Sequence, residues 1–518
     1  MEIKKLNLVK QILTATKKLL RTTKNISRKM NKLITKLEET SNVSQTHNGA
    51  KSLASSLNAC VDLFGSLGAM RARSDDQVIS AFSKAFAEDK LTAMRILFYV
   101  RDIRGGQGER KVFRTIIKYL ADVHTEYLRK NLNLIETYGR WDDFYVLEGT
   151  KLWGDVVEIF KIQLGKDLET ETPSLLGKWL KSSNTSSKES RRLARKLYTD
   201  LGWSEKTYRK TLSDLRRKID VVEKRMCENE WSSIQYSHVP SRAAMIYRNA
   251  FKKHDERRYQ NYLDDVASGK QEIKAATLYP YDLIRNVYSG NYNQTVALQW
   301  DNLPNYVEPF NGLVIYDTSG SMGSCSYYGG TSGQVRPIDV AISLAIYIAE
   351  RNEGEWKNCA IPFATDARFE KFKGSNIYEK FRNLNKDGYW GSTNLQSAFD
   401  LILNTAVKNK ISADDMPKTL FIVSDMQFNQ ACDSNKRSNF EQIEKKYRKA
   451  GYERPNVVFW NVNAYGNDAP VKFDENGTAL ISGCSPAILK TVLSGEVLTP
   501  VDLMNQAVHC ERYQKVQV

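Results

Sequence analysis

Between residues 301 and 518, short apolar runs alternate with helical patterns, and this alternation restricts the possible folds more than any other feature of the sequence. The apolar runs are rich in β-branched residues and cover 312–316, 359–363, 420–424 and 457–462. Helical periodicity lies between them, at 337–350, 395–403 and 440–450. Almost continuously apolar strands that alternate with helices are typical of a mostly parallel sheet covered on both faces. We therefore predict a doubly wound α/β domain.

The preceding part of the chain is predicted to be helical. Apolar residues recur at i, i+3 and i+4 within 78–86, 93–100, 112–120 and 128–135, and strand-like alternation is scarce. Stacked helix pairs, as in a HEAT-like solenoid or an irregular bundle, fit this pattern. The sequence thus indicates a multidomain α plus α/β protein. Its predicted parts are a basic amphipathic helical segment with a polar linker (1–57), a helical repeat-like domain (58–300) and the α/β domain (301–518).

Nothing in the sequence indicates a membrane or secreted protein. No run of about 18 uncharged apolar residues is present. The basic start of the chain has some character of a mitochondrial presequence, but Glu2 and the preference for Lys over Arg argue against one. The seven cysteines are scattered, without metal-binding spacing, which favours reduced thiols. We expect a cytoplasmic, intracellular protein.

Positive charge is concentrated in the first 300 residues. They hold 53 Lys and Arg against 35 Asp and Glu, whereas residues 301–518 hold 23 against 25. Such a one-sided charge favours a polyanionic partner, with nucleic acid first and an acidic membrane surface second. A solvated basic surface without a ligand is the alternative.

Three polar segments of the predicted α/β domain could converge on a metal ion. Asp317, Ser319 and Ser321 follow the first apolar run, Thr393 precedes a helix, and Asp425 follows the run at 420–424. The carboxyl ends of parallel strands meet at one edge of a sheet, where ligands gather. Hydroxyl and carboxylate oxygens suit Mg²⁺, with Mn²⁺ or Ca²⁺ as substitutes.

This ligand pattern resembles the metal-ion-dependent adhesion site (MIDAS) of von Willebrand factor A domains, and all five positions match. The resemblance implies a von Willebrand A-type fold, and a metal that leaves one coordination position for an acidic residue of a partner. Asp425 would then act directly or through water. One departure is the segment 323–335, which separates Ser321 from its helix by more than a typical A domain does.

Basic and aromatic residues cluster on the predicted helices of residues 200–260. At helical spacing part of each cluster shares a face, where Lys and Arg can meet phosphates and Tyr can stack on bases. The predicted nucleic-acid-binding residues are Tyr208, Arg209, Lys210, Arg216, Arg217, Lys218, Arg248, Lys252, Lys253, Arg257 and Arg258. Solvated helix faces remain the alternative.

Two motifs of the helical part have structural interpretations. The glycine-rich segment 101–110 lacks the Gly-Lys-Ser/Thr ending of a P-loop, so we expect it to turn one helix into the next. Its residues Arg101, Asp102, Glu109 and Arg110 should pair with neighbours. Trp141 with Asp142 and Asp143 is expected to be a buried aromatic followed by a helix cap.

Several phrases, among them RDIRGGQGER (101–110), YGRWDDFYVL (138–147) and FIVSDMQF (421–428), resemble an uncharacterised family that joins a helical, TROVE-like region to a metal-binding A domain. The same domain order is similar to that of the Ro autoantigen family. The resemblance implies a ribonucleoprotein component that binds RNA through its helical domain and a partner through its metal. The alternative is a metal-dependent protein-interaction scaffold that binds no nucleic acid.

Catalysis is not expected. The sequence shows no Ser-His-Asp, Cys-His or paired-carboxylate arrangement, and its five histidines are scattered. A metal on Asp317 and Asp425 could activate water, but A-domain metals usually serve binding.

Overall fold

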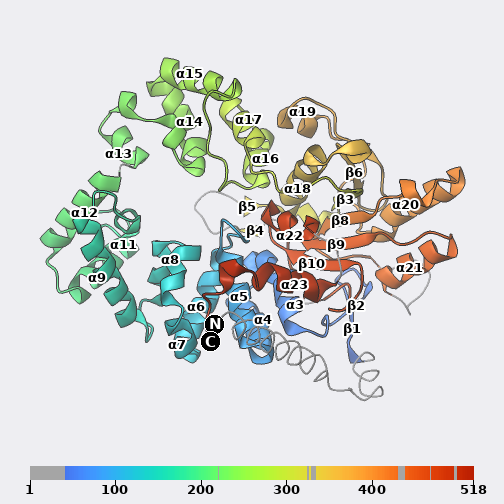
Figure 1. Ribbon diagram of the computed structural model, residues 1–518, viewed down its shortest axis with the longest axis horizontal. Helices are drawn as coiled ribbons and strands as arrows, with labels where there is room; N and C mark the ends of the chain where they lie inside the picture. Colours follow the sequence, from blue (N-terminus) through green and yellow to red (C-terminus); the bar gives the residue numbers. More distant parts are fainter. Residues whose placement is uncertain are drawn as a thin grey trace, which may run out of the picture. The chain divides into compact units, whose positions relative to one another are not determined.

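A six-stranded sheet lies at the centre of the C-terminal part of the computed structural model (Figure 1). Its strand order is β10-β9-β8-β3-β6-β7, and all neighbours are parallel except β7, which pairs antiparallel with β6. Both β3 and β6 are buried at every residue, as expected for strands covered on two faces. The strands are β3 (Gly312–Asp317), β6 (Cys359–Phe363), β7 (Glu370–Lys371), β8 (Thr419–Ser424), β9 (Asn456–Asn461) and β10 (Thr478–Ser482).

The structure describes residues 41–219, 221–323, 326–327, 334–429, 438–466, 468–494 and 499–518. Residues 1–40, within the basic segment and linker predicted at 1–57, lie outside this part of the chain. Residues 45–518 form one compact unit. Within it, the prediction of a helical part followed by a mostly parallel α/β part is confirmed.

The order of the strands reverses direction at β3, in the middle of the sheet. The chain enters at β3 in the middle, builds β6 and β7 on one side, and then returns to β8 on the other side. At such a switch point the loops after neighbouring strands diverge, which leaves room for a ligand at the carboxyl ends of the strands. The loops after β3 and β8 therefore frame the candidate site.

Helices from both ends of the chain cover the sheet. Helix α18, buried along nearly its whole length, packs against β3, while α3 (Ala59–Ser66) and α23 pack against β10. One hydrophobic core therefore runs from the sheet into the helical part. The helices after β3 are α18 (Pro337–Arg351), α19 (Ile377–Arg382), α20 (Leu395–Asn409), α21 (Asn439–Lys449), α22 (Leu489–Leu493) and α23 (Pro500–Val508).

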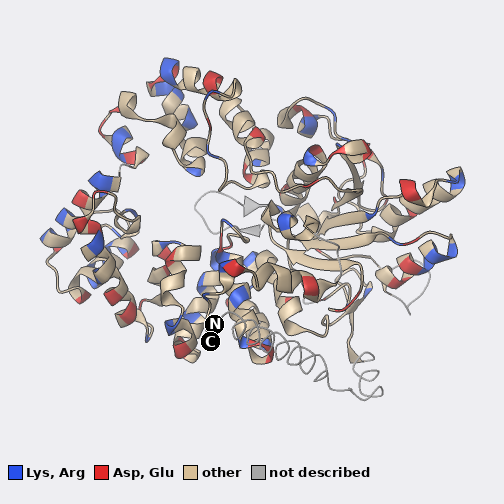
Figure 2. Ribbon diagram, viewed as in Figure 1, with Lys and Arg blue, Asp and Glu red and all other residues tan. Residues whose placement is uncertain are grey.

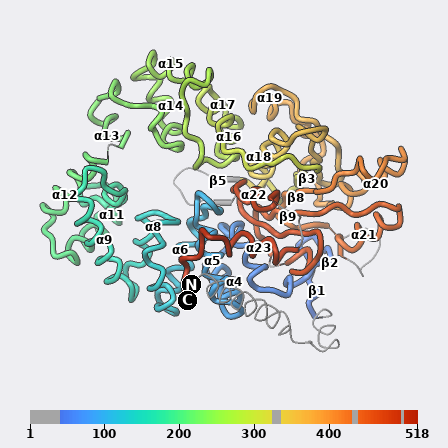
Figure 3. The backbone as a smooth tube through the Cα atoms, in the orientation of Figure 1, coloured from blue at the N-terminus to red at the C-terminus, as the bar shows by residue number. Residues whose placement is uncertain are grey.

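The remaining helices follow one another in an arc that begins and ends beside the sheet, where α3 meets β10 and α16 meets α18 (Figure 3). Successive helices pack pairwise, which confirms the repeat-like helical architecture. They are α4 (Asp75–Glu88), α5 (Lys90–Arg101), α6 (Lys111–Val123), α7 (Thr125–Arg129), α8 (Ile135–Tyr138), α9 (Trp153–Glu169), α10 (Leu176–Trp179), α11 (Lys188–Asp200), α12 (Glu205–Ile219), α13 (Val222–Cys227), α14 (Ser241–His254), α15 (Glu256–Ala267), α16 (Pro280–Tyr288) and α17 (Gln294–Asp301).

Helix α4 shows how local sequence sets these boundaries. Ser74 and Gln77 form a capping box, and two aspartates in the first turn complement the helix dipole. The buried residues Val78, Phe82 and Phe86 recur every four positions, so one stripe of the helix faces the core.

The polar stretch predicted as a linker is packed against the α/β part. The backbone of Leu53 pairs with that of Ala469, and the Thr46 hydroxyl donates to the carbonyl of Phe428 over 2.6 Å. Residues 45–57 are therefore held in place, contrary to a free linker.

Two pairs of short strands lie outside the six-stranded sheet. They are β1 (Val43–Gln45) with β2 (Lys51–Leu53), and β4 (Ser326–Tyr327) with β5 (Gln334–Val335).

The C-terminal residues are fastened to the helical part by a buried carboxylate. Asp102 accepts hydrogen bonds from the Arg512 guanidinium over 2.9 Å and from the Tyr513 hydroxyl over 3.0 Å. The Tyr513 ring, 1% exposed, packs on Tyr138 and Tyr99 with centroids 5.4 and 5.9 Å apart. This cluster joins α5, α8 and the end of the chain.

Replacing Tyr513 with alanine should destabilise the protein strongly. Loss of a fully buried aromatic side chain typically costs about 3–5 kcal/mol, because it removes apolar contacts and leaves a cavity. Urea unfolding monitored by circular dichroism measures this change. Ile162→Ala, at a position 52% exposed, is the control and should change stability little. Equal stability of the two variants would contradict the packing described.

Within the described residues no helix is long and apolar enough to cross a bilayer. Five cysteines in this part of the chain form no disulfide: Cys60, Cys227, Cys359, Cys484 and Cys510. The other two, Cys325 and Cys432, lie outside the described residues.

Candidate functional site

The loop after β3 places three predicted ligands at the carboxyl end of the strand, beside the switch point of the sheet. Asp317 ends the strand and is fully buried, and its Oδ1 accepts from the backbone N–H of Ser319 over 2.9 Å. The Ser319 and Ser321 hydroxyl oxygens lie 3.1 Å apart. The loop is fixed because the Gly320 N–H donates to the carbonyl of Gly391 over 3.0 Å. The predicted Asp-x-Ser-x-Ser segment thus turns its oxygens toward one point.

Asp425 approaches from the neighbouring strand. It directly follows β8, is fully buried, and accepts from the backbone N–H of Gln427 through Oδ1 over 3.1 Å. Its Oδ2 is buried without a hydrogen-bond partner. The preceding residue, Ser424, donates its hydroxyl to Oδ2 of Asp317 over 2.5 Å. The two strand ends are therefore tied together, and one carboxylate oxygen remains available for a ligand.

Thr393 lies beside this cluster, but its hydroxyl has a neighbour that the sequence did not indicate. The Asn48 amide donates to the Thr393 hydroxyl over 3.3 Å and to the carbonyl of Gln427 over 2.5 Å. Two hydrogen bonds join Asn429 to the Thr393 backbone. The Thr393 N–H donates to the side-chain oxygen of Asn429 over 3.2 Å, and the Asn429 N–H donates to the carbonyl of Thr393 over 2.7 Å. Asn48 thus links the loop before β2 to the predicted ligand loops.

The electrostatics of the cluster favour a cation. Burial and the charge of Asp425 raise the pKa of Asp317 above its usual value, and burial likewise raises the pKa of Asp425. Two carboxylates removed from water are costly unless an opposite charge compensates them. No cluster of three or more His, Cys, Asp or Glu side chains gathers in the described ranges. The donor set is therefore two carboxylates with hydroxyls, which fits a hard divalent ion.

Trp390 borders the cluster. Its backbone N–H donates to the carbonyl of Thr318 over 2.8 Å, and its side chain is 53% exposed. A Cβ added at Gly323 would lie 2.5 Å from the Trp390 ring, so this glycine permits the close approach of the ring to the loop. Most of the long segment noted at 323–335 lies outside the described residues.

Several predicted nucleic-acid-binding residues have structural roles instead. Tyr208 is fully buried and donates to the carbonyl of Lys181 over 2.7 Å, so it cannot stack on a base. Arg216 bonds the carbonyls of Gly177 and Leu180, and Arg248 is 8% exposed. Lys218 donates to the carbonyl of Thr170, and Arg258 to Asp255 and two carbonyls. Helical periodicity identifies which basic and aromatic residues share a helix face. It does not identify which of these side chains are buried in the protein.

The other members of these clusters are exposed. Arg217 pairs with Asp214 over 2.8 Å at the surface. The exposed side chains among the predicted residues of α12, α14 and α15 are Arg209, Lys210, Arg217, Lys252, Lys253 and Arg257. Figure 2 shows basic and acidic residues interspersed along the helices.

The structure reveals a large basic cavity that sequence reasoning missed. It has a volume of about 1400 Å³ and is bordered by the helical arc and by the start of α18. Its described lining holds six Asp and Glu and eleven Lys and Arg, and the latter are Arg71, Arg101, Arg110, Lys111, Arg114, Lys118, Arg140, Arg192, Arg242, Arg285 and Arg336. These residues are spread over more than 250 positions of the sequence. No local run of basic residues therefore predicts that they line one cavity.

Tyrosines line the same cavity. Tyr279 and Tyr281 are stacked with ring centroids 5.4 Å apart, and Tyr288 is 58% exposed with the Arg336 guanidinium 4.5 Å above its ring. Flat aromatic and guanidinium surfaces next to cations are suited to unpaired bases.

The segment Trp141–Leu147 has its predicted role and a further one. Trp141 is buried as expected, and Asp143 does accept from the Arg140 N–H over 2.9 Å. However, both Asp142 and Asp143 form a buried ion-pair centre with arginines from other elements. Residues of the glycine-rich segment 101–110 pair with neighbouring residues, as predicted. Arg101 pairs with Asp143, Asp102 with Arg512, and Glu109 with Arg71 over 3.1 Å.

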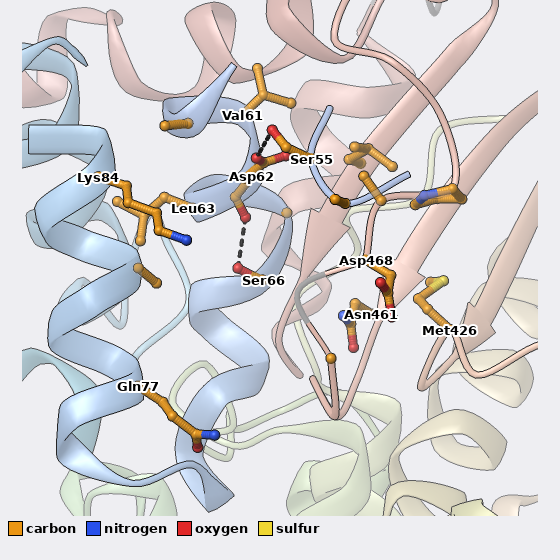
Figure 4. A pocket seen from close by; sticks show the side chains of 18 of the residues that line it. Ser55, Val61, Asp62, Leu63, Ser66, Gln77, Lys84, Met426, Asn461 and Asp468 are labelled. Atoms are coloured by element: carbon orange, nitrogen blue, oxygen red, sulfur yellow. Dashed lines mark hydrogen bonds between the residues drawn. The ribbon is translucent and has the colours of Figure 1, made fainter. Parts of the chain in front are cut away.

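A second, smaller pocket of about 340 Å³ lies between α3 and α4 and the ends of β9 and β10 (Figure 4). Asp62 faces it, accepting from the Ser55 hydroxyl over 2.5 Å. Met426, with φ of 64°, borders it from the metal-site loop, opposite Lys84 and Gln77 of α4. The residue after Asp425 therefore connects the candidate metal centre to this pocket.

The chain belongs to a family defined by two domains of unknown function. The model of DUF2828 matches residues 46–205 and 194–305, and that of DUF7788 matches residues 311–517. The uncharacterized protein L728 of Acanthamoeba polyphaga mimivirus is 30% identical over 511 residues, covering 89% of this chain and 86% of the relative. The predicted membership of an uncharacterised family is confirmed.

Among solved structures, the Ro (RSR) protein of Deinococcus radiodurans is similar to this chain. The similarity covers 86% of this chain and 93% of the Ro protein, with a TM-score of 0.31 and 12% sequence identity.

Proposed function

We propose that this protein is an RNA-binding ribonucleoprotein component. Its basic cavity takes up a single-stranded RNA segment, and its α/β part is a von Willebrand A-type domain that holds one divalent cation, preferably Mg²⁺. An acidic residue of a partner protein completes the coordination of that ion. Both sites serve binding rather than catalysis.

The composition of the cavity lining carries the RNA proposal. Eleven basic against six acidic side chains give the described wall an excess of positive charge. Its volume of about 1400 Å³ exceeds the roughly 300–1,000 Å³ typical of pockets for small molecules, which favours a segment of a polymer. The exposed Tyr288 offers a stacking surface, which favours single-stranded over base-paired RNA.

A titration of a labelled single-stranded RNA at several salt concentrations tests this proposal. About five phosphate contacts would release enough counterions to lower the affinity roughly 100-fold between 50 and 200 mM salt. Fluorescence anisotropy measures the affinity. Affinity that does not change with salt would contradict binding through phosphates.

The metal proposal rests on the unpartnered Oδ2 of Asp425 beside buried Asp317. The ion would be held by Asp317, Ser319, Ser321, Thr393 and Asp425, directly or through water. When bound, it supplies a positive charge to which a carboxylate from outside can attach. The neighbouring Asn48 keeps the Thr393 hydroxyl in place.

Asn48→Ala should therefore weaken metal binding by about 10- to 100-fold, as is typical when a residue that orients a ligand is lost. Isothermal titration with Mn²⁺ measures the affinity. Asn249→Ala, at an exposed position on α14, is the matched control and should leave the affinity unchanged. If Asn48→Ala binds Mn²⁺ as tightly as the unaltered protein, Asn48 does not position a metal ligand.

The second candidate function is a metal-dependent protein-interaction scaffold that binds no nucleic acid. The pair of buried carboxylates, Asp317 and Asp425, favours this function, because a metal bound there could recruit a partner without any use of the basic cavity. Under this alternative the purified protein has the absorbance of protein alone, and ribonuclease treatment does not alter partner capture. A raised ratio of absorbance at 260 and 280 nm that ribonuclease removes would favour RNA.

A further inference from the structure

The pocket of about 340 Å³ beside α3 has two walls of different character (Figure 4). On the side of the sheet, Met426, Phe459 and Leu480 line it with apolar side chains that are at most 6% exposed. On the side of α3 and α4, Asp62 and Lys84 add charged groups to the wall. Pockets for small molecules combine apolar walls with a few polar groups, in volumes of roughly 300–1,000 Å³. A small amphipathic molecule therefore fits this pocket.

Asp62 is a carboxylate that forms no ion pair with a described residue. Its Oδ1 accepts from the backbone N–H of Ser56 over 2.8 Å, and its Oδ2 accepts from the Ser55 hydroxyl over 2.5 Å. Each of these oxygens can accept a second hydrogen bond. Burial raises the pKa of Asp62, and the two hydrogen bonds and the charge of Lys84 offset this effect only in part. A cation that enters the pocket would therefore stabilise the carboxylate.

The charges on the pocket wall are nearly balanced. The lining holds three acidic residues, Asp62, Asp76 and Asp468, and two basic ones, Arg73 and Lys84. Lys84 is exposed, and within the described ranges its ammonium forms no hydrogen bond or ion pair. The basic cavity differs, because its wall carries a large excess of positive charge. A nearly neutral wall with charges of both signs favours a molecule that also carries one charge of each sign.

We propose that this pocket binds a free amino acid with an apolar side chain. Its α-ammonium contacts Asp62, and its α-carboxylate faces Lys84. Its side chain packs on the apolar wall of Met426, Phe459 and Leu480. None of these residues lines the basic cavity or belongs to the proposed metal ligands, so the inference does not depend on the proposed function.

Isothermal titration of the full chain with phenylalanine, leucine and methionine tests this inference. Each amino acid is compared with two analogues, the amine that lacks the carboxylate and the acid that lacks the ammonium. At least one amino acid should bind about tenfold or more tighter than both of its analogues, as expected when one charge-assisted hydrogen bond is lost.

Two variants test the assigned contacts. In Asp62→Asn the amino acid should lose its advantage over the acid analogue, and in Lys84→Met it should lose its advantage over the amine analogue. Asp62 lies in the first turn of α3, so circular dichroism checks the fold of its variant, whereas Lys84 is exposed and its variant should fold. Lys90→Met, at an exposed position of α5 outside the pocket lining, is the matched control and should keep both preferences.

Two results would overturn the inference. The first is that none of the three amino acids binds, or that an analogue binds as tightly as its amino acid in every case. The second is that Lys84→Met keeps the full preference over the amine analogue, which would place the carboxylate elsewhere.

Discussion

Reversing two charges on the cavity wall, by Lys118→Glu together with Arg285→Glu, should weaken single-stranded RNA binding about 100-fold or more at 0.1 M salt. Loss of one phosphate contact with a single strand lowers the affinity about fivefold at this salt concentration. Reversing the charge removes the attraction and adds a repulsion of similar size, so the logarithm of the affinity changes about twice as much. Lys118 is exposed on α6 and Arg285 is half-buried on α16, and both line the cavity. Fluorescence anisotropy with a labelled oligonucleotide measures the loss.

The matched control is Lys252→Glu with Lys253→Glu, which makes the same change in net charge on exposed positions of α14 outside the cavity lining. We expect a loss of less than about tenfold, because only the general field of the protein changes. Circular dichroism confirms that both double variants are folded. Equal losses in the two would place RNA on the outer surface and contradict the cavity as its site.

Asp425→Asn should abolish the stabilisation of the protein by Mg²⁺. At a free metal concentration about 100 times its Kd, a bound ion stabilises the native state by about 2.7 kcal/mol, which raises the unfolding temperature measurably. The substitution removes one of two adjacent buried charges and the unpartnered oxygen. Without metal, the variant should therefore unfold at the same or a higher temperature than the unaltered protein.

Thermal unfolding in EDTA and in Mg²⁺ measures both effects. Asp414→Asn, at an exposed position before β8, is the matched control and should keep the full response to Mg²⁺. A response that persists in Asp425→Asn would exclude this carboxylate as a ligand. No response of the unaltered protein to Mg²⁺, Mn²⁺ or Ca²⁺ would contradict the metal proposal as a whole.

The sheet was predictable because its central strands are buried on both faces, which leaves an almost wholly apolar run in the sequence. The predicted runs at 312–316, 359–363, 420–424 and 457–462 match β3, β6, β8 and β9 within one residue at either end. The edge strands β7 and β10 were missed. The two-residue strand β7 has too little sequence for a pattern, and β10 begins with Thr478 after a glycine turn.

The helical part shows where periodicity is insufficient. The run 128–135 has the periodicity of a helix, but α7 ends at Arg129 and a short 3-10 turn precedes α8. Both Lys and Arg carry long apolar stems, so a basic residue at helical spacing can point inward and bond carbonyls, as Arg216 does. The sequence also gives no sign that α3 from the helical part covers the sheet.

The two candidate sites differ in how far the sequence could reveal them. The proposed metal ligands follow strand ends, and the topology of a parallel sheet brings strand ends together, so Asp317 and Asp425 could be grouped in advance. Asn48 could not, because it comes from a loop 345 residues before Thr393, the predicted ligand that it contacts. The basic cavity depends on side chains from several helices and the start of α18, which only the folded structure brings together.

Photochemical cross-linking of a bound single-stranded RNA, followed by identification of the cross-linked peptides, tests the central claim most directly. The account predicts cross-links within the cavity-lining segments 101–118, 140–148 and 279–289, with Tyr288 among the modified residues, and their loss in the Lys118→Glu, Arg285→Glu variant. Cross-links confined to the exposed basic residues of α12, α14 and α15, or a failure to cross-link any RNA, would contradict it.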